Sequence, residues 1–287
     1  MSALLIRSAA CAAIFALIPA SGHAAQVGLC KFDTVQFAFA GTPLDQASCL
    51  LRFVKNKGTS STPQQVPPWL SDRVGKPTGI APASLQAVLE GAGVSANDIG
   101  GPIPAEPDVS EKRYFVIHDT SAPELTGIAA FPANINSADW SGNSLNGWAD
   151  TALRVNVITN RTGSSRTLRD FTMARPKPAT KLEQDNLYVA AKKYFLHAEN
   201  IQPRIKPAGS WGYIAPDPGF PPAQIERLAL VYLAASVRAG HWLIPAFHFN
   251  IDDGLATANG HDDPQAFVLA DWVAAVERLA SKVVPTQ

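Results

Sequence analysis

The feature that most limits what this chain can fold into is an alternation of apolar runs and helical patterns in its second half. Residues 113–117 (RYFVI) are almost continuously apolar, which is typical of a strand covered on both faces. Residues 222–239 repeat apolar side chains at helical spacing, between a Pro-Pro pair and Gly240. Strand-like runs also occur within 153–158, 188–198 and 242–247, and a last helical pattern covers 264–279. Strands that alternate with helices predict an α/β domain.

The first 25 residues have the pattern of a secretory signal peptide. A single charge, Arg7, precedes an apolar stretch from Ala9 to Ala20 and a run of small residues that ends at Ala25. This pattern predicts cleavage after Ala24 or Ala25 and export to the periplasm or the extracellular space. The apolar stretch is shorter than the ~20 residues that span a bilayer, so we expect no stable membrane insertion after cleavage. An uncleaved anchor is the alternative interpretation.

Loss of residues 1–25 also changes the charge and cysteine content. The remaining chain has 23 basic and 24 acidic residues, a net charge of −1, which gives no electrostatic footprint for nucleic acid. Cys11 is removed, and Cys30 and Cys49 remain. An even pair in an exported chain predicts a disulfide, and two buried thiols are the alternative.

Composition divides the exported chain into two parts. Residues 26–105 form a small N-terminal module, which holds the two cysteines and predicted helices near 44–54 and 82–91. It ends in a Gly- and Pro-rich linker that begins at Gly100. Residues 106–287 form the larger domain.

Histidine and aspartate follow the predicted strands of the larger domain. His118 ends the first strand, His248 follows the strand 242–247, and His261 and Asp263 lie 13 and 15 residues beyond His248. Catalytic zinc takes three protein ligands and keeps one position for water, and a sheet fixes the position of side chains at its strand ends. Each residue also has a structural explanation; Asp263 before Pro264 is a suitable helix N-cap. Spacing alone leaves both interpretations open.

Three separated motifs resemble those of one enzyme family. Residues 114–121 (YFVIHDTS) are similar to the "VIHHT" strand of the type 2 N-acetylmuramoyl-L-alanine amidases, which include AmpD-like enzymes and peptidoglycan recognition proteins. Residues 222–248 resemble the helix and strand before that family's second ligand histidine, and 261–267 (HDDPQAF) resemble its "K-T-D-P-G" motif. The resemblance covers roughly residues 112–283. It implies a mixed central sheet flanked by helices.

The resemblance also implies a set of site residues. His118, His248 and Asp263 correspond to the ligands of Zn²⁺, and Glu199 corresponds to the general base or water positioner. His261 stands where the family often has a lysine that faces the oxyanion. Because the segment between His248 and Asp263 is longer than in the family, His261 remains a rival third ligand.

The implied activity is zinc-dependent hydrolysis of the amide between N-acetylmuramic acid and L-alanine in peptidoglycan. Zinc lowers the pKa of a bound water towards ~7 and polarises the carbonyl, Glu199 accepts the proton, and His261 donates to the oxyanion. The alternative for Glu199 is a structural carboxylate paired with Arg204. The resemblance thus implies that residues 106–287 are the catalytic domain. Two alternative functions remain: a muropeptide-binding module without catalysis, and a zinc hydrolase of another amide or peptide bond. The N-terminal module could bind cell wall, inhibit the enzyme or extend the fold, and the sequence does not choose among these.

Further substrate contacts are expected from a long loop and a strand end. Residues 122–151 are rich in Asn, Gly and Ser and contain Trp140 and Trp148, which suit glycan stacking or, alternatively, anchor the loop in the core. Asn200, next to Glu199, is predicted to contact substrate or to orient a ligand, and it could instead satisfy backbone groups.

Overall fold

The computed structural model describes residues 25–55, 60–185, 189–208, 212–256 and 261–283. Apart from Ala25, the predicted signal peptide lies outside these residues. Within the described ranges, no helix combines the length and the apolar composition that crossing a membrane requires.

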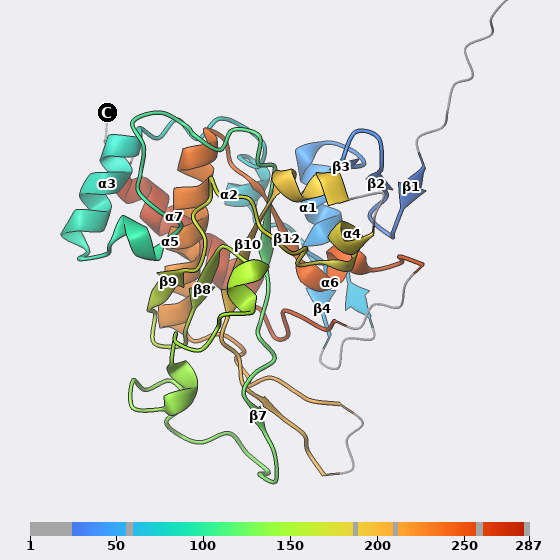
Figure 1. The fold of residues 1–287 in the computed structure, drawn as a ribbon, viewed down its shortest axis with the longest axis vertical. Helices are drawn as coiled ribbons and strands as arrows, with labels where there is room; N and C mark the ends of the chain where they lie inside the picture. The colour runs from blue at the N-terminus through green and yellow to red at the C-terminus, as the bar shows by residue number, and fades with distance from the viewer. Residues whose placement is uncertain (1–24, 56–59, 186–188, 209–211, 257–260, 284–287) are drawn as a thin grey trace, which may run out of the picture.

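A five-stranded mixed sheet forms the centre of the molecule (Figure 1), with strand order β12-β6-β10-β8-β9. Four strands are parallel, and β9 runs antiparallel to β8. Every residue of β6, β8 and β12 is buried, which explains why β6 and β12 are continuously apolar and why β8 is apolar except for Thr159. The predicted α/β class is confirmed. The strands are β6 (Tyr114–Ile117), β8 (Val157–Thr159), β9 (Ser165–Thr167), β10 (Phe195–Asn200) and β12 (Ile244–Phe247).

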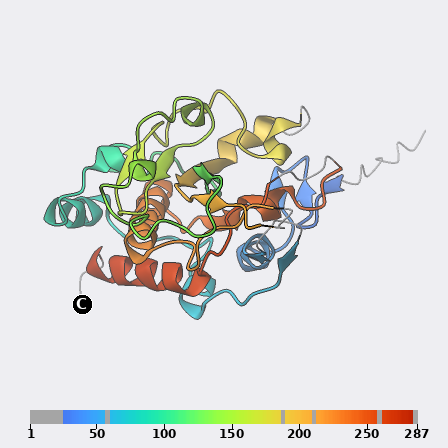
Figure 2. The same ribbon diagram turned by 90° about the horizontal axis from the view of Figure 1, so that it is seen from below.

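Helix α5 (Pro222–Ala239) packs against β8 and β10, and α7 (Leu269–Val283) packs against α5. Both views place these two helices side by side (Figures 1 and 2). Helix α5 has proline at its first position, where a backbone N–H would have no helical partner and its absence costs nothing. The helix ends at Gly240, whose φ of 77° is a conformation that glycine adopts without strain. Its predicted boundaries are therefore confirmed.

Shorter elements connect the sheet and the long helices. Further helices are α1 (Pro43–Leu50), α2 (Pro68–Ser71), α3 (Pro82–Gly91), α4 (Lys181–Gln184) and α6 (His248–Asp252). The 3-10 helices are η1 (Ala96–Asp98), η2 (Ser141–Asn143), η3 (Thr151–Leu153) and η4 (Val189–Tyr194). Two-residue strands complete the fold: β1 (Gln26–Val27), β2 (Phe32–Asp33), β3 (Ala38–Phe39), β4 (Phe53–Val54), β5 (Ser61–Thr62), β7 (Glu124–Leu125) and β11 (Arg204–Ile205).

The N-terminal residues share the core of the rest of the chain. Helix α1 packs against β12, and the rings of Phe32 and Phe39 contact Phe195 and Tyr114 of the central sheet. One cluster of buried apolar side chains runs through both parts. Residues on both sides of the predicted boundary at residue 105 therefore belong to one hydrophobic core.

Two predicted helices differ from those observed. The helical pattern at 44–54 stops at Leu50, because residues 53–54 pair with β5 as strand β4. The last helix begins at Leu269 rather than at residue 264. The backbone N–H of Gln265 donates to Asp119 Oδ2 at 2.9 Å, and Ala266 has φ 52°, so this segment is held out of the helix. Asp263 is therefore not a helix N-cap.

Candidate metal centre

The sheet brings the predicted ligands to one edge. Strands β6 and β12 are parallel neighbours in which Phe247 pairs with Ile117, so His118 and His248 follow at the same level. Asp263 reaches this edge from the loop before α7. Its carbonyl accepts from the N–H of Phe249 at 2.9 Å, and its Oδ2 lies 3.4 Å from the N–H of Asp119.

The three side chains converge on one point. His118 Nδ1 and His248 Nδ1 lie 3.0 Å apart, and Asp263 Oδ2 lies 3.0 Å from His248 Nδ1 and 3.4 Å from His118 Nδ1. Tetrahedral ligands at bonds of about 2.0–2.1 Å stand about 3.3 Å from one another, close to this triangle. A proton on one of the two Nδ1 atoms can point along only one edge of this triangle, so a single hydrogen bond does not account for all three short distances. The three residues are 3%, 2% and 4% exposed, and this buried cluster can hold a metal ion.

The other ring nitrogens of the two histidines face their own partners. His248 Nε2 lies 3.1 Å from Asp252 Oδ2, and Asp252 in turn accepts from the N–H groups of Lys181 and Leu182 at 2.8 and 2.9 Å. His118 Nε2 lies 2.8 Å from the Nδ1 of His197. We assign the proton to Nε2 in both histidines. Nε2 of His248 faces the carboxylate of Asp252, and Nε2 of His118 faces a ring nitrogen of His197. This tautomer leaves both Nδ1 lone pairs for an ion.

A buried ion pair continues the chain of contacts behind His118. His197 Nε2 lies 3.4 Å from Glu183 Oε2, and Glu183 forms an ion pair with Arg175. The sequence patterns did not identify these three residues. The local signal that exists is the capping box at the start of α4, where Thr180 and Glu183 bond each other's backbone N–H groups; it places Glu183 at a helix start but does not relate it to His118.

The electrostatics of the cluster favour positive charge between its carboxylates. Burial and the neighbouring His248 lower the pKa of His118 to about 4, so this ring is neutral. Burial would also lower the pKa of His248, but Asp263 and Asp252 outweigh it and hold that pKa well above its usual value. The His248 ring lies between these two carboxylates, which favour positive charge on it, and a metal ion at Nδ1 would take the place of a proton there.

Glu199 lines the same cavity of about 420 Å³ as the three predicted ligands. It lies on the face of β10 that carries His197, because side chains alternate along a strand. Its Oε1 is buried and has no hydrogen-bond partner among the described residues. Burial, Asp263 and Asp119 raise its pKa well above the usual value. The alternative pairing with Arg204 is not observed: Arg204 Nη2 lies 2.6 and 2.7 Å from the two oxygens of Asp119.

His261 also lines the cavity, but it stands outside the triangle of ligand atoms. Its side chain is 37% exposed, its Nδ1 lies 3.8 Å from Asp263 Oδ1, and its ring centroid is 4.0 Å from that of His248. With His248 and Asp252 it forms a second group of potential ligands whose atoms lie within 4.8 Å. The geometry favours Asp263 as third ligand and keeps His261 within reach of the same site.

The predicted substrate contacts separate into those at the cavity and those away from it. Trp148 lines the cavity, together with Asp150, Thr151 and Arg154 from the next residues of the chain. Trp140 is not among the lining residues, and its ring covers Gly142.

Asn200 is fully buried and does not line the cavity. Its amide donates to the carbonyl of His118 at 2.7 Å, and its Oδ1 accepts from Thr159 at 2.6 Å. The substrate role predicted for Asn200 does not fit these contacts, because both ends of its amide are already engaged. Asn200 instead holds the strand end that carries His118.

Comparison with known proteins gives no relative: no protein-family model, curated protein or solved structure matches this chain.

Proposed function

We propose that this protein is a zinc-dependent hydrolase of the amide that joins N-acetylmuramic acid to L-alanine in peptidoglycan. The observation that carries the proposal is the triangle of His118 Nδ1, His248 Nδ1 and Asp263 Oδ2, with Glu199 in the same cavity. These are the four residues to which the sequence resemblance to type 2 amidases assigns the roles of three ligands and a general base.

The ligand chemistry supports zinc. Two imidazole nitrogens and one carboxylate oxygen are a typical set for catalytic zinc, which keeps a further position for water. Zinc, when bound, supplies a Lewis acid for the carbonyl and brings the pKa of a water towards ~7. The backing of each histidine by a further polar partner is also typical of zinc sites.

Three other residues of the cavity have separate roles in proton transfer, oxyanion stabilisation and substrate binding. Glu199 accepts a proton from the attacking water and returns it to the leaving amine. An elevated pKa suits a group that does both near neutral pH. His261, partly exposed in the cavity wall, donates to the oxyanion as charge develops on the substrate. Trp148 offers an aromatic wall for a sugar or peptide.

The test is incubation of residues 26–287 with intact peptidoglycan, followed by mass spectrometry of the soluble products. We expect stem peptides with a free L-alanine amine, no release with chelator, and recovery when zinc is returned. Glu199→Gln should slow release by at least about 100-fold, whereas Glu226→Gln, the same change on an exposed glutamate of α5, should not slow it.

Other outcomes identify the alternatives. Tight muropeptide binding without any cleavage would favour a binding module. Cleavage at another bond, with the same chelator sensitivity, would favour a zinc hydrolase of different specificity. Cleavage that resists both chelator and Glu199→Gln would refute the proposed site.

A further inference from the structure

Helix α6 carries two residues of the candidate metal centre and is only 5 residues long. His248 is its first residue and Asp252, which faces His248 Nε2, is its last. A helix this short is not stable by itself, so tertiary contacts must set its orientation. Many of those contacts come from residues 25–55, which we term the disulfide segment.

The first connection is made by Asn250, in the middle of α6. Its Nδ2 donates to the carbonyl oxygens of Leu50 at 3.0 Å and Arg52 at 2.7 Å. Asn250 is fully buried, so no water replaces these two bonds if they are lost. A buried amide with two backbone acceptors fixes the distance between α6 and the end of α1.

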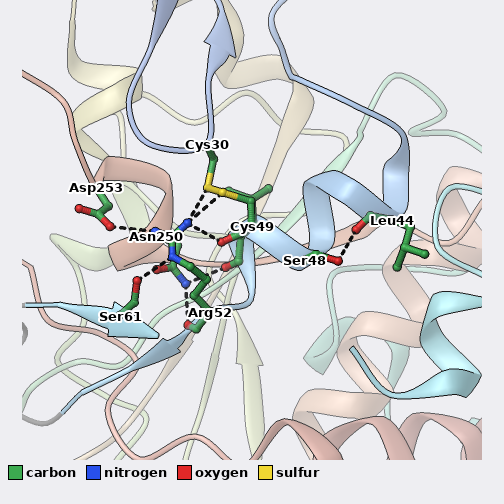
Figure 3. Close-up of a disulfide and its surroundings, with 9 residues drawn as sticks. Cys30, Leu44, Ser48, Cys49, Arg52, Ser61, Asn250 and Asp253 are labelled. Carbon is green, nitrogen blue, oxygen red and sulfur yellow. Dashed lines mark hydrogen bonds and ion pairs between the residues drawn. A yellow bond between two sulfur atoms is a disulfide. The ribbon is translucent and has the colours of Figure 1, made fainter. Parts of the chain in front are cut away.

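The second connection is made at Asp253, which follows α6. Its carbonyl accepts from the N–H of Leu29 at 2.7 Å, and its carboxylate lies 2.8 Å from Arg52 Nη2. The same guanidinium contacts the disulfide: Arg52 Nη1 lies 3.1 Å from Cys30 Sγ, 2.9 Å from Cys49 Sγ and 3.0 Å from the carbonyl of Cys49 (Figure 3).

These contacts come from two strips of chain that the disulfide joins. Cys30 and Cys49 lie at disulfide distance, with 2.10 Å between their sulfurs, as the sequence predicts. Leu29 directly precedes Cys30, Leu50 directly follows Cys49, and Arg52 lies three residues after Cys49. The disulfide therefore holds together the two segments that contact the end of α6. Without it, each strip could move separately from the helix.

We propose that the disulfide segment is a clamp on α6 that sets how tightly the protein holds its metal, with Asn250 and Arg52 as positioning residues. This inference rests on the metal site of the proposed function, but not on amide cleavage. It also assigns a role to the N-terminal residues, for which the sequence left several open. Loss of the clamp lets His248 leave the triangle, so that metal dissociates more readily.

The test measures zinc affinity by competition with a chromophoric chelator, on residues 26–287. Asn250→Ala, and separately the pair Cys30→Ser with Cys49→Ser, should weaken zinc affinity about 10- to 100-fold, as loss of supporting contacts around a metal site does. The matched control is Asn143→Ala. Asn143 is also buried and donates to two backbone carbonyls, those of Ile135 and Ser137, each at 2.9 Å, but its side-chain hydrogen bonds go to residues outside α6.

A milder variant keeps the test possible if Asn250→Ala does not fold. Arg52→Gln removes the ion pair with Asp253, and it should also weaken zinc affinity. Wild-type affinity in the folded variants would overturn the clamp, as would an equal loss in Asn143→Ala. Wild-type protein that binds no zinc would overturn both the clamp and the metal site. Zinc binding with the expected losses but no peptidoglycan cleavage would leave the clamp standing and refute only the amidase.

Discussion

A buried ion pair between Glu183 and Arg175 lies behind the candidate metal centre. Its two side chains are 0% and 3% exposed, respectively. Glu183 Oε2 also accepts from the N–H groups of Ala179 at 2.9 Å and Thr180 at 3.1 Å. The substitution Glu183→Gln keeps the shape of the side chain and removes its charge, so that Arg175 is left buried without a counter-charge.

The size of the effect follows from this burial. Removing one partner of a buried ion pair costs about 3–5 kcal/mol, since the other charge stays desolvated. For a chain of this length, each kcal/mol lowers the unfolding midpoint by about 2–4 °C, so Glu183→Gln should lower it by roughly 6–20 °C. The matched control is Glu226→Gln, which breaks an exposed pair with Arg278 and should cost under about 1 kcal/mol.

The assay is thermal unfolding of metal-free protein, by circular dichroism, as a function of pH. Burial would raise the pKa of Glu183, but its neighbours His197 and Arg175 outweigh burial and hold that pKa well below its usual value. Because burial keeps His197 uncharged, with its own pKa lowered, we attribute the shift to Arg175. A lowered carboxyl pKa contributes stability above the unfolded-state value of about 4.3, and the contribution is lost as pH falls through the folded pKa.

The deficit of Glu183→Gln should therefore be complete at pH 7 and should shrink below about pH 4.3. Equal midpoints for Glu183→Gln and Glu226→Gln at pH 7 would refute this reasoning. A deficit that stays constant down to pH 2 would show that shape, rather than charge, is responsible.

Three further predictions concern catalysis. Glu199→Gln should retain zinc and lower the cleavage rate by about 10²- to 10⁴-fold, measured by zinc content and product release, because the proton acceptor is lost. His261→Ala should also retain zinc and lower kcat by about 10²- to 10³-fold if it donates to the oxyanion, whereas loss of zinc would identify it as the third ligand. Trp148→Ala should raise KM several-fold with little change in kcat, since a wall contact binds substrate and transition state alike, and an unchanged KM would contradict that role.

The sequence predicted the parts of the fold that depend on local patterns. Strand β6 and helix α5 were recognisable because continuous burial and helical spacing leave direct traces, and Pro222 and Gly240 mark the ends of α5. The gathering of His118, His248 and Asp263 was predictable as well, because two of them follow parallel strands and the third lies in a motif with a family resemblance.

The rest depends on contacts between distant segments. His197 lies on β10, Glu183 on α4 and Arg175 in the loop before α4, and no spacing in the sequence relates them to His118. The late start of α7 depends on Asp119, which bonds the backbone of Gln265. No local pattern reports such a bond.

Direct measurement of zinc stoichiometry and affinity, by titration calorimetry of metal-free residues 26–287, tests the central claim most directly. We predict one zinc ion per chain for the wild type, and at least a 100-fold loss of affinity for Asp263→Ala, because outer partners alone account for about 10- to 100-fold. Asp262→Ala, the neighbouring carboxylate that lies outside the triangle, should bind as the wild type does. No zinc binding by the wild type, or equal affinity in Asp263→Ala, would contradict the account.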